Sequence, residues 1–168
     1  MSLVVTPPRK LEKSDDRSGF SCGASELDEW IAKYAWQNQA ANSATTYVMT
    51  ENSRVIGYYA ITMSAYDRAM APRTLSKGMP KQIPCILLAR LAVDKRYQGE
   101  GWGVDLLRDA LLRSVGLSES IGAAAVLIHC RDDAARDFYM RNGDFVQSPV
   151  EDLHLLVSVP ALKAYVDS

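Results

Sequence analysis

The sequence has 168 residues, of which 48% are apolar, with 19 basic against 20 acidic side chains and a net charge of −1. This length fits one folded domain, and the apolar content excludes an intrinsically disordered chain. No stretch approaches the roughly 20 apolar residues of a membrane-spanning helix, and no export signal is visible. We therefore expect one domain over residues 1–168, in the cytoplasm and without a membrane segment.

The three cysteines are an odd number, and their spacing is neither that of a metal site nor that of a redox pair. They are Cys22, Cys85 and Cys130. We predict reduced thiols, no disulfide and no bound metal.

Positive charge is concentrated in the middle of the chain. Between Arg68 and Arg96 there are seven basic residues and one acid, Asp94, whereas acids outnumber bases on both sides. Such a run is usually a solvated face of the protein, and the sharper interpretation is a local surface that binds anions.

The first half of the chain predicts a helix followed by a hairpin and a loop. Apolar residues at helical spacing indicate a helix from Ser25 to Asn38, and Ser25-Glu-Leu-Asp28 resembles a capping box. Strands over 45–50 and 54–64 with a short turn between them predict a hairpin. Residues 66–84, with three prolines and much of the basic excess, predict a loop long enough to suggest a function.

The second half predicts strands that alternate with helices. We expect strands at 85–93, at 123–129, around 145–146 and at 153–158, and helices at 103–115 and 132–141, the second ended by Asn142-Gly143 in a left-handed conformation. These elements together predict a mixed α/β fold.

The most informative segment is a glycine-rich turn between a strand and a helix. Gly99, Gly101 and Gly103 alternate along Gln98-Gly-Glu-Gly-Trp-Gly103 and expose backbone N–H groups where a helix starts. The positive end of a helix attracts anions, so this turn is suited to hold one. The glycine spacing differs from that of a Rossmann turn and of a nucleotide P-loop.

Two motifs of this chain resemble those of the GNAT N-acetyltransferase superfamily. Gln98-Gly-Glu-Gly-Trp-Gly103 is similar to the family's pyrophosphate loop, Q/R-x-x-G-x-G/A, and Asp132 to Gly143 resembles its second motif, N-x-x-A-x-x-[FL]-Y. The resemblance covers about residues 20 to 160. Asp132 in place of the frequent Asn, and the ending Asn142-Gly-Asp-Phe145, are departures that leave the main donor-binding groups intact.

The resemblance implies a GNAT fold and acetyl-CoA as the acyl donor. That fold is a mixed, mostly antiparallel sheet of six or seven strands with about four helices, and the fourth and fifth strands splay apart to receive the pantetheine arm. The residues so implied in donor binding are Leu91, Ala92, Val93, Gln98, Gly99, Glu100, Gly101, Trp102, Gly103, Asp132, Ala135 and Phe138.

Tyr139 lies where the family places its general acid, near the sulfur of the thioester. The alternative for this side chain is a buried core tyrosine. No general base stands out, because His129 and His154 both fall in apolar strands and are expected to be packed histidines. Apolar surroundings raise the pKa of a thiol, which argues against an acyl-cysteine route through Cys85 or Cys130.

Further segments resemble the GNAT toxins of bacterial type II toxin–antitoxin modules. They are Ile83–Asp94, Gly23–Trp30, Gln37–Gln39 and Val55–Tyr59. Members of that group acetylate the α-amino group of aminoacyl-tRNA and block translation. The resemblance therefore implies aminoacyl-tRNA as substrate, a ribbon-helix-helix antitoxin as partner, and a homodimer.

A tRNA acceptor arm is densely charged, so basic residues around an acceptor cleft would bind it. The candidates for substrate binding are Lys33, Arg73, Lys77, Lys81 and Arg90. Each loop lysine is equally explained as solvated surface. Arg90 lies in an apolar strand and must be paired, reach a cleft or bridge a dimer interface, because an unpartnered buried guanidinium is costly.

Two other functions stay open at this point. One is a GNAT enzyme that acetylates a small amine or a protein N-terminus. The other is a catalytically silent module that binds acyl-CoA and acts through a protein partner, which the intact glycine turn and Tyr139 disfavour.

Overall fold

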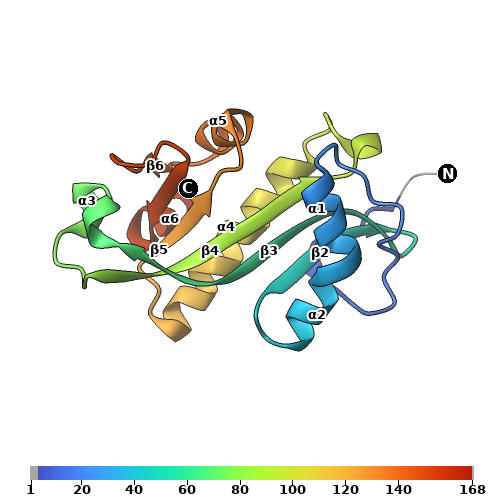
Figure 1. Ribbon diagram of the computed structural model, residues 1–168, viewed down its shortest axis with the longest axis horizontal. Coiled ribbons are helices and arrows are strands. Elements are labelled where there is room, and N and C mark those ends of the chain that lie inside the picture. Colours follow the sequence, from blue (N-terminus) through green and yellow to red (C-terminus); the bar gives the residue numbers. More distant parts are fainter. Residues whose placement is uncertain (1–3, 168) are drawn as a thin grey trace. The chain divides into compact units, whose positions relative to one another are not determined.

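The computed structural model describes residues 4–167 (Figure 1). The strands are β1 (Arg9–Lys10), β2 (Thr45–Glu51), β3 (Arg54–Asp67), β4 (Gln82–Val93), β5 (Ala125–His129), β6 (Val146–Gln147) and β7 (His154–Ser158). The helices are α1 (Ser25–Glu29), α2 (Ala35–Ala40), α3 (Arg73–Ser76), α4 (Trp102–Ile121), α5 (Asp133–Asn142) and α6 (Val159–Val166). A π-helix, η1 (Trp30–Tyr34), joins α1 to α2, and two 3₁₀ turns are η2 (Arg68–Met70) and η3 (Lys95–Tyr97).

The seven strands follow the order β1-β2-β3-β4-β5-β7-β6. Pairing is antiparallel for β1–β2, β2–β3, β5–β7 and β6–β7, and parallel for β4–β5. The part of β4 that pairs with β5 is Cys85–Leu88, and the strand continues beyond it to Val93. The predicted fold class, a mixed and mostly antiparallel sheet with helices, is confirmed.

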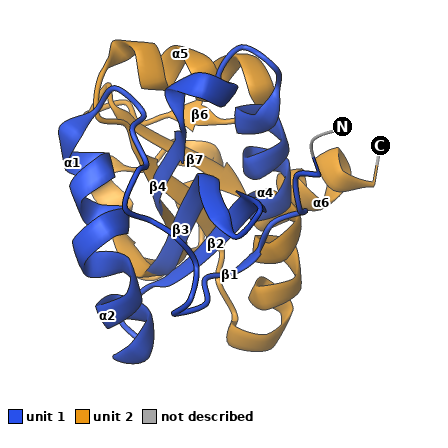
Figure 2. Cartoon of the chain, turned by 90° about the vertical axis from the view of Figure 1, so that its right-hand side faces the viewer, with its two compact units in different colours: residues 1–62, 89–110 blue, residues 63–88, 111–168 orange. Residues whose placement is uncertain are grey.

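The chain forms two compact units, which Figure 2 distinguishes by colour. Unit 1 comprises residues 1–62 and 89–110, and unit 2 comprises residues 63–88 and 111–168. The chain passes from one unit to the other inside β3, β4 and α4. Within residues 4–167, no helix combines the length and the apolar character that crossing a membrane requires.

Unit 1 has a core between its first helical run and its strands. Apolar residues of α1, η1 and α2 pack on side chains of β2, β3 and the end of β4. This cluster contains Leu11, Phe20, Trp30, Ile31, Ala35, Val48, Val55, Tyr58, Ala60 and Ala92. The helical periodicity of the sequence pointed to this buried face.

Unit 2 has a second core, which lies under the segment that connects β3 to β4. It contains Tyr66, Ala71, Leu75, Ile83, Cys85, Ala125, Leu127 and Leu156. Ala71 and Leu75 belong to the predicted loop and are buried, so this segment is anchored to the sheet by its apolar side chains. Burial of these residues stabilises the fold by about 25 cal/mol per Å² of apolar surface.

The start of the first helix differs from the predicted capping box. The N-cap is Ala24, whose side chain cannot accept a hydrogen bond, and Ser25 is already helical. The Asp28 carboxylate instead accepts a hydrogen bond from the N–H of Cys22 at 2.8 Å. The helical run extends to Ala40, and the π-helical turn within it is not predicted by the periodicity of the sequence.

The predicted loop over residues 66–84 is shorter in the structure. β3 continues to Asp67 and β4 begins at Gln82, with the turns η2 and α3 between them. The Asp67 side chain caps η2 by accepting the N–H of Ala69. The long strands extend into this region because Tyr66 and Ile83 are buried. The proline-rich composition of residues 66–84 favoured a loop and so hid these strand ends.

The later helices also depart from prediction. α4 continues past Val115 to Ile121, because Gly116 faces open space while Ser114 and Ser118 on either side are buried. The strand β1 and the helix α6 were both missed. The start of α6 does carry a sequence signal, since Ser158 accepts the N–H of Ala161 and a proline lies in the first turn.

Gly143 does not end α5 in a left-handed conformation, as predicted. Its φ of −164° and ψ of 167° are extended and open to any residue. A Cβ at this position would lie 2.6 Å from the ring of Phe145, so glycine is required by the close approach of that ring.

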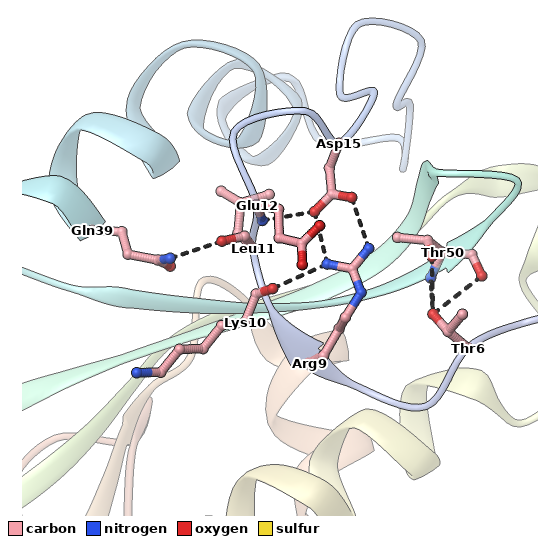
Figure 3. Close-up of polar contacts among 8 residues, drawn as sticks. All are labelled: Thr6, Arg9, Lys10, Leu11, Glu12, Asp15, Gln39 and Thr50. Carbon is pink, nitrogen blue, oxygen red and sulfur yellow. Dashed lines mark hydrogen bonds and ion pairs between the residues drawn. The ribbon is translucent and has the colours of Figure 1, made fainter.

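An ion pair with a buried carboxylate lies within the N-terminal segment of unit 1 (Figure 3). Arg9 donates two hydrogen bonds to Asp15, at 2.7 and 2.9 Å, and the N–H of Glu12 donates to the same carboxylate. The side chain of Asp15 is 2% exposed and that of Arg9 34%. Burial raises the pKa of Asp15, but the bonds from Arg9 and Glu12 outweigh it and hold the pKa below its ordinary value.

We expect Asp15→Asn to lower the free energy of unfolding by about 2 kcal/mol at pH 7, because it leaves Arg9 without its counter-charge. Since the folded pKa is depressed, this stabilisation is present above about pH 4 and is lost as the pH falls through the folded pKa. Urea unfolding at pH 7 and pH 3 measures it. Glu12→Gln is the control, and an equal difference at both pH values would contradict the prediction.

Candidate active site

The glycine turn is exposed and its backbone N–H groups are not used by the protein. Gly99 and Gly101 have φ values of 81° and 91°, which L-residues rarely adopt, and a Cβ at either would meet nothing within 4 Å. In the described part of the chain, residues 4–167, the N–H groups of residues 99–103 have no acceptor. These donors lie at the N-terminal end of the 20-residue helix α4, where an anion is favoured.

Two side chains within unit 1 fix the shape of this turn. The buried Asp94 carboxylate caps η3 by accepting the N–H of Arg96, and it also accepts the N–H of Ser21. Burial raises the pKa of Asp94, but its bonds from Arg96 and Ser21 bring the net pKa below the ordinary value. The carboxylate therefore stays ionised at neutral pH.

Gln98 is the second of these side chains. Its amide nitrogen donates to the carbonyl oxygens of Cys22, at 2.9 Å, and Val93, at 2.8 Å. Both protons of the amide are thereby engaged, which joins the turn to the end of β4 and to the segment before α1. In this structure Gln98 positions the turn, and the unbonded N–H groups of the turn are available to bind an anion.

The expected donor strand, Leu91 to Val93, is the last part of β4. It follows the segment Cys85–Leu88 that pairs with β5. Ala92 is buried, whereas Leu91 and Val93 are half-buried. A strand segment beyond its ladder with β5 is the arrangement that an extended ligand arm needs for backbone pairing on that side.

Tyr139 lies in unit 2, on α5, with 7% of its surface exposed. Its ring packs edge-on against Phe138 and Phe145, with centroid distances of 5.3 and 6.2 Å. Its hydroxyl has no hydrogen-bond partner among residues 4–167. Burial raises the pKa of Tyr139, and Cys130 adds to this, so the phenol is protonated at neutral pH.

The other residues named from the sequence in this region are Asp132, at the N-cap of α5, and Ala135 and Phe138 within the helix. Asp132 is the N-cap and accepts the N–H of Ala135 at 2.8 Å, while its second oxygen pairs with Arg131 at 3.0 Å. Ala135 and Phe138 are half-buried. The capping role explains an acidic residue at position 132 by local geometry alone.

The basic residues named from the sequence divide between the two units. Lys33 and Arg90 are in unit 1, and Arg73, Lys77 and Lys81 are exposed in unit 2. Lys33 lies 3.6 Å from Glu29 in an exposed pair. Within residues 4–167, the three unit 2 side chains have no acidic partner within 4 Å.

Sequence reasoning missed the aromatic partner of Arg90. The guanidinium carbon lies 4.3 Å from the centroid of the Trp30 ring. From the sequence, Trp30 is an apolar residue at helical spacing and the end of the toxin-like segment Gly23–Trp30, with no partner predicted; in the structure it is the first residue of the π-helix η1. π-helical turns often mark functional positions.

The histidines and cysteines offer no nucleophile. Contrary to expectation, His129 is exposed at the end of β5, where it stacks on His154 at 4.2 Å. Partial desolvation of its ring and the neighbouring His154 lower the pKa of His129. All three cysteines are free, and burial raises the pKa of each thiol to about 11, as the sequence indicated for Cys85 and Cys130. Among residues 4–167 there is no group of three or more metal-ligating side chains.

Comparison with known proteins identifies the family. A family model described as the acetyltransferase (GNAT) domain matches residues 42–143. The chain is also 39% identical, over 159 residues, to a tRNA-acetylating toxin of Mycobacterium tuberculosis, and the match covers 95% of each protein. The chain belongs to the GNAT acetyltransferase family.

Solved structures share the fold of this chain. A structure of AtaT complexed with acetyl-methionyl-tRNAfMet matches with a TM-score of 0.87 and 23% identity, covering 98% of this chain and 99% of that one. A mutant of AtaT bound to acetyl-CoA and to the C-terminus of the antitoxin AtaR matches with a TM-score of 0.82 and 22% identity, covering all of both chains. At these identities the likeness concerns the fold.

We expect Gln98→Leu to loosen the glycine turn, because two hydrogen bonds to carbonyl oxygens are lost. The free energy of unfolding should fall by about 1–2 kcal/mol, and amide hydrogen exchange of residues 95–101 should accelerate. Hydrogen-exchange mass spectrometry checks this, with the exposed Gln82→Leu as control. Unchanged exchange in the turn would show that Gln98 does not hold it.

Proposed function

We propose that this chain is a toxin that transfers the acetyl group of acetyl-CoA to the α-amino group of aminoacyl-tRNA and thereby blocks translation. The observation that carries the proposal is its 39% identity to a tRNA-acetylating toxin over 95% of both proteins. The free N–H groups of the glycine turn and the buried phenol of Tyr139 supply the chemistry that such a reaction needs.

Donor binding rests on backbone groups of unit 1. The N–H groups of residues 99–103, at the start of α4, receive the pyrophosphate, and the absence of side chains at Gly99 and Gly101 leaves room for it. Leu91–Val93 pair with the pantetheine arm as an added strand would. Acetyl-CoA supplies the thioester carbon that the amine attacks. Asp132, Ala135 and Phe138 contribute from unit 2.

The residue that handles a proton in this reaction is Tyr139. The new C–N bond forms at the thioester carbon as the C–S bond breaks, and the phenol donates its proton to the departing sulfur. The nitrogen releases one proton to solvent on becoming an amide, and the phenolate takes up one proton from solvent, which restores the enzyme. Burial keeps the hydroxyl protonated, as a proton donor must be, and no structural hydrogen bond within residues 4–167 competes for it. An α-amino group, with an ordinary pKa of about 7.7–8.0, loses its own proton to water more readily than a lysine does.

The acceptor is held by positive charge. Lys33, Arg73, Lys77, Lys81 and Arg90 contact the phosphates of the tRNA acceptor arm. The chain acts in the cytoplasm as one domain and a homodimer, and a ribbon-helix-helix antitoxin holds it inactive. Support for the antitoxin comes from AtaT, a protein of the same fold whose structure includes the C-terminus of AtaR.

The test is transfer of labelled acetyl groups from acetyl-CoA to charged and uncharged tRNA. We expect label on charged tRNA alone, because only it carries a free α-amino group. Label on a polyamine or an aminoglycoside but not on charged tRNA would show that the enzyme acetylates small amines instead.

We expect Tyr139→Phe to lower kcat by about 100-fold or more, since a positioned general acid contributes on that order. Affinity for coenzyme A should be unchanged, because backbone groups dominate donor binding. Single-turnover acetyl transfer and calorimetry with coenzyme A measure the two effects. Tyr66→Phe, which removes the hydroxyl of another buried tyrosine of unit 2, is the matched control; wild-type turnover in Tyr139→Phe would remove the Tyr139 hydroxyl from the mechanism.

A further inference from the structure

Arg90 is a half-buried guanidinium without an anionic partner. Within residues 4–167 it has no carboxylate within 4 Å and no hydrogen bond. Arg9 and Arg96, also in unit 1, each bind a buried aspartate through at least two hydrogen bonds. Burial lowers the pKa of Arg90, and Tyr58 opposes this effect. The desolvation of the charged guanidinium costs free energy, and no ion pair within residues 4–167 offsets that cost.

The Arg90 guanidinium lies over a rigid aromatic platform. Trp30, 7% exposed, lies beneath it at 4.3 Å and stacks on Tyr58, with centroids 5.9 Å apart and planes inclined by 17°. The Tyr58 hydroxyl donates to the carbonyl oxygen of Leu27 at 2.7 Å, which ties the platform to the helix. A cation over an indole face is held in orientation as well as attracted.

Because none of its N–H groups is bonded within residues 4–167, the guanidinium over Trp30 keeps its donors for another group. Those donors lie in the guanidinium plane and match two oxygens of a phosphate or carboxylate at once. Lys33, on the same helical run, is paired with Glu29 in solvent. Of these two basic candidates in unit 1, Arg90 is therefore the one prepared for an external anion.

Arg90 also lies beside the proposed donor strand. It directly precedes Leu91–Val93 on β4, and side chains two residues apart on a strand share a face. Ala92 belongs to the same buried cluster as Trp30 and Tyr58, so Arg90 faces the side of β4 that the first helical run covers. An anion on Arg90 would thus lie on the helix-covered side, next to the segment expected to bind pantetheine.

We propose that Arg90, oriented by Trp30, binds a phosphodiester near the 3′ end of the tRNA substrate and so positions the aminoacyl group at the donor strand. The inference rests on the proposed function and deepens it by assigning Trp30 as a positioning residue. A phosphate is favoured over a protein carboxylate because the attacking amine of an aminoacyl-tRNA lies within a nucleotide of its terminal phosphodiester, while Arg90 directly precedes the expected donor segment.

The experiment measures binding of deacylated tRNA to the full-length protein over a range of salt concentrations, in the Tyr139→Phe background to avoid toxicity. We expect Arg90→Gln to weaken binding about tenfold and to reduce the slope of log K against log salt by about 0.7–0.9, the share of one phosphate. Arg90→Lys should keep the slope but bind several-fold more weakly, because an ammonium lacks the planar fork.

Trp30→Phe tests the platform. We expect a several-fold loss of tRNA affinity with the slope unchanged, because the charge remains and its orientation is weakened. Arg108→Gln, an exposed arginine on α4 in the same unit, removes equal charge and should leave affinity nearly unchanged. Calorimetry with coenzyme A confirms that each variant is folded and retains the donor site.

The outcomes separate the two proposals. If the parent protein binds no tRNA, the proposed function and this inference both fail. If it binds tRNA and Arg90→Gln binds equally well with the same slope, only the inference fails. A loss of coenzyme A affinity in Arg90→Gln, with tRNA affinity retained, would assign Arg90 to the donor site and overturn it, as would a loss confined to binding of an antitoxin peptide.

Discussion

The buried carboxylate of Asp94 is the interaction on which the donor end of unit 1 depends. It lies where β4 ends, and its own N–H donates to the carbonyl oxygen of Ile56 on β3. Its two oxygens accept the N–H groups of Ser21 and Arg96, so the carboxylate and backbone of this one residue join it to two segments far from it in the sequence, those of Ser21 and Ile56. Because the carboxylate is buried and fully bonded, the chain leaves the strand in a fixed direction.

The fixed direction in which the chain leaves β4 also orients the glycine turn that follows. Gln98 bonds back to Val93 and Cys22, and residues 99–103 follow with their N–H groups free of protein acceptors within residues 4–167. Donors that are already aligned lose little entropy when an anion binds. A glycine-rich turn without such anchoring would have to be ordered by its ligand.

The charge pattern shows how the structure reassigns residues that look alike in sequence. Of the basic residues between positions 68 and 96, Arg68 donates to the carbonyl oxygen of Met79 and Arg96 binds Asp94, so both serve the fold. Arg73 and Lys77 are exposed with no acidic partner within residues 4–167. Arg90 belongs to neither group, because it is half-buried and lies over the ring of Trp30. A count of charges treats all of these as one patch.

The order of the elements around the glycine turn, the free cysteines and the family could all be predicted from the sequence, because each follows from local spacing within windows of about twenty residues. Only the packing of the folded chain shows that position 143 needs glycine because the ring of Phe145 lies so close, and not because of a left-handed turn. It also decided that Arg90 meets Trp30 across 60 positions of sequence. Periodicity reports which face of an element is buried, whereas the partner on that face is set by how distant segments pack.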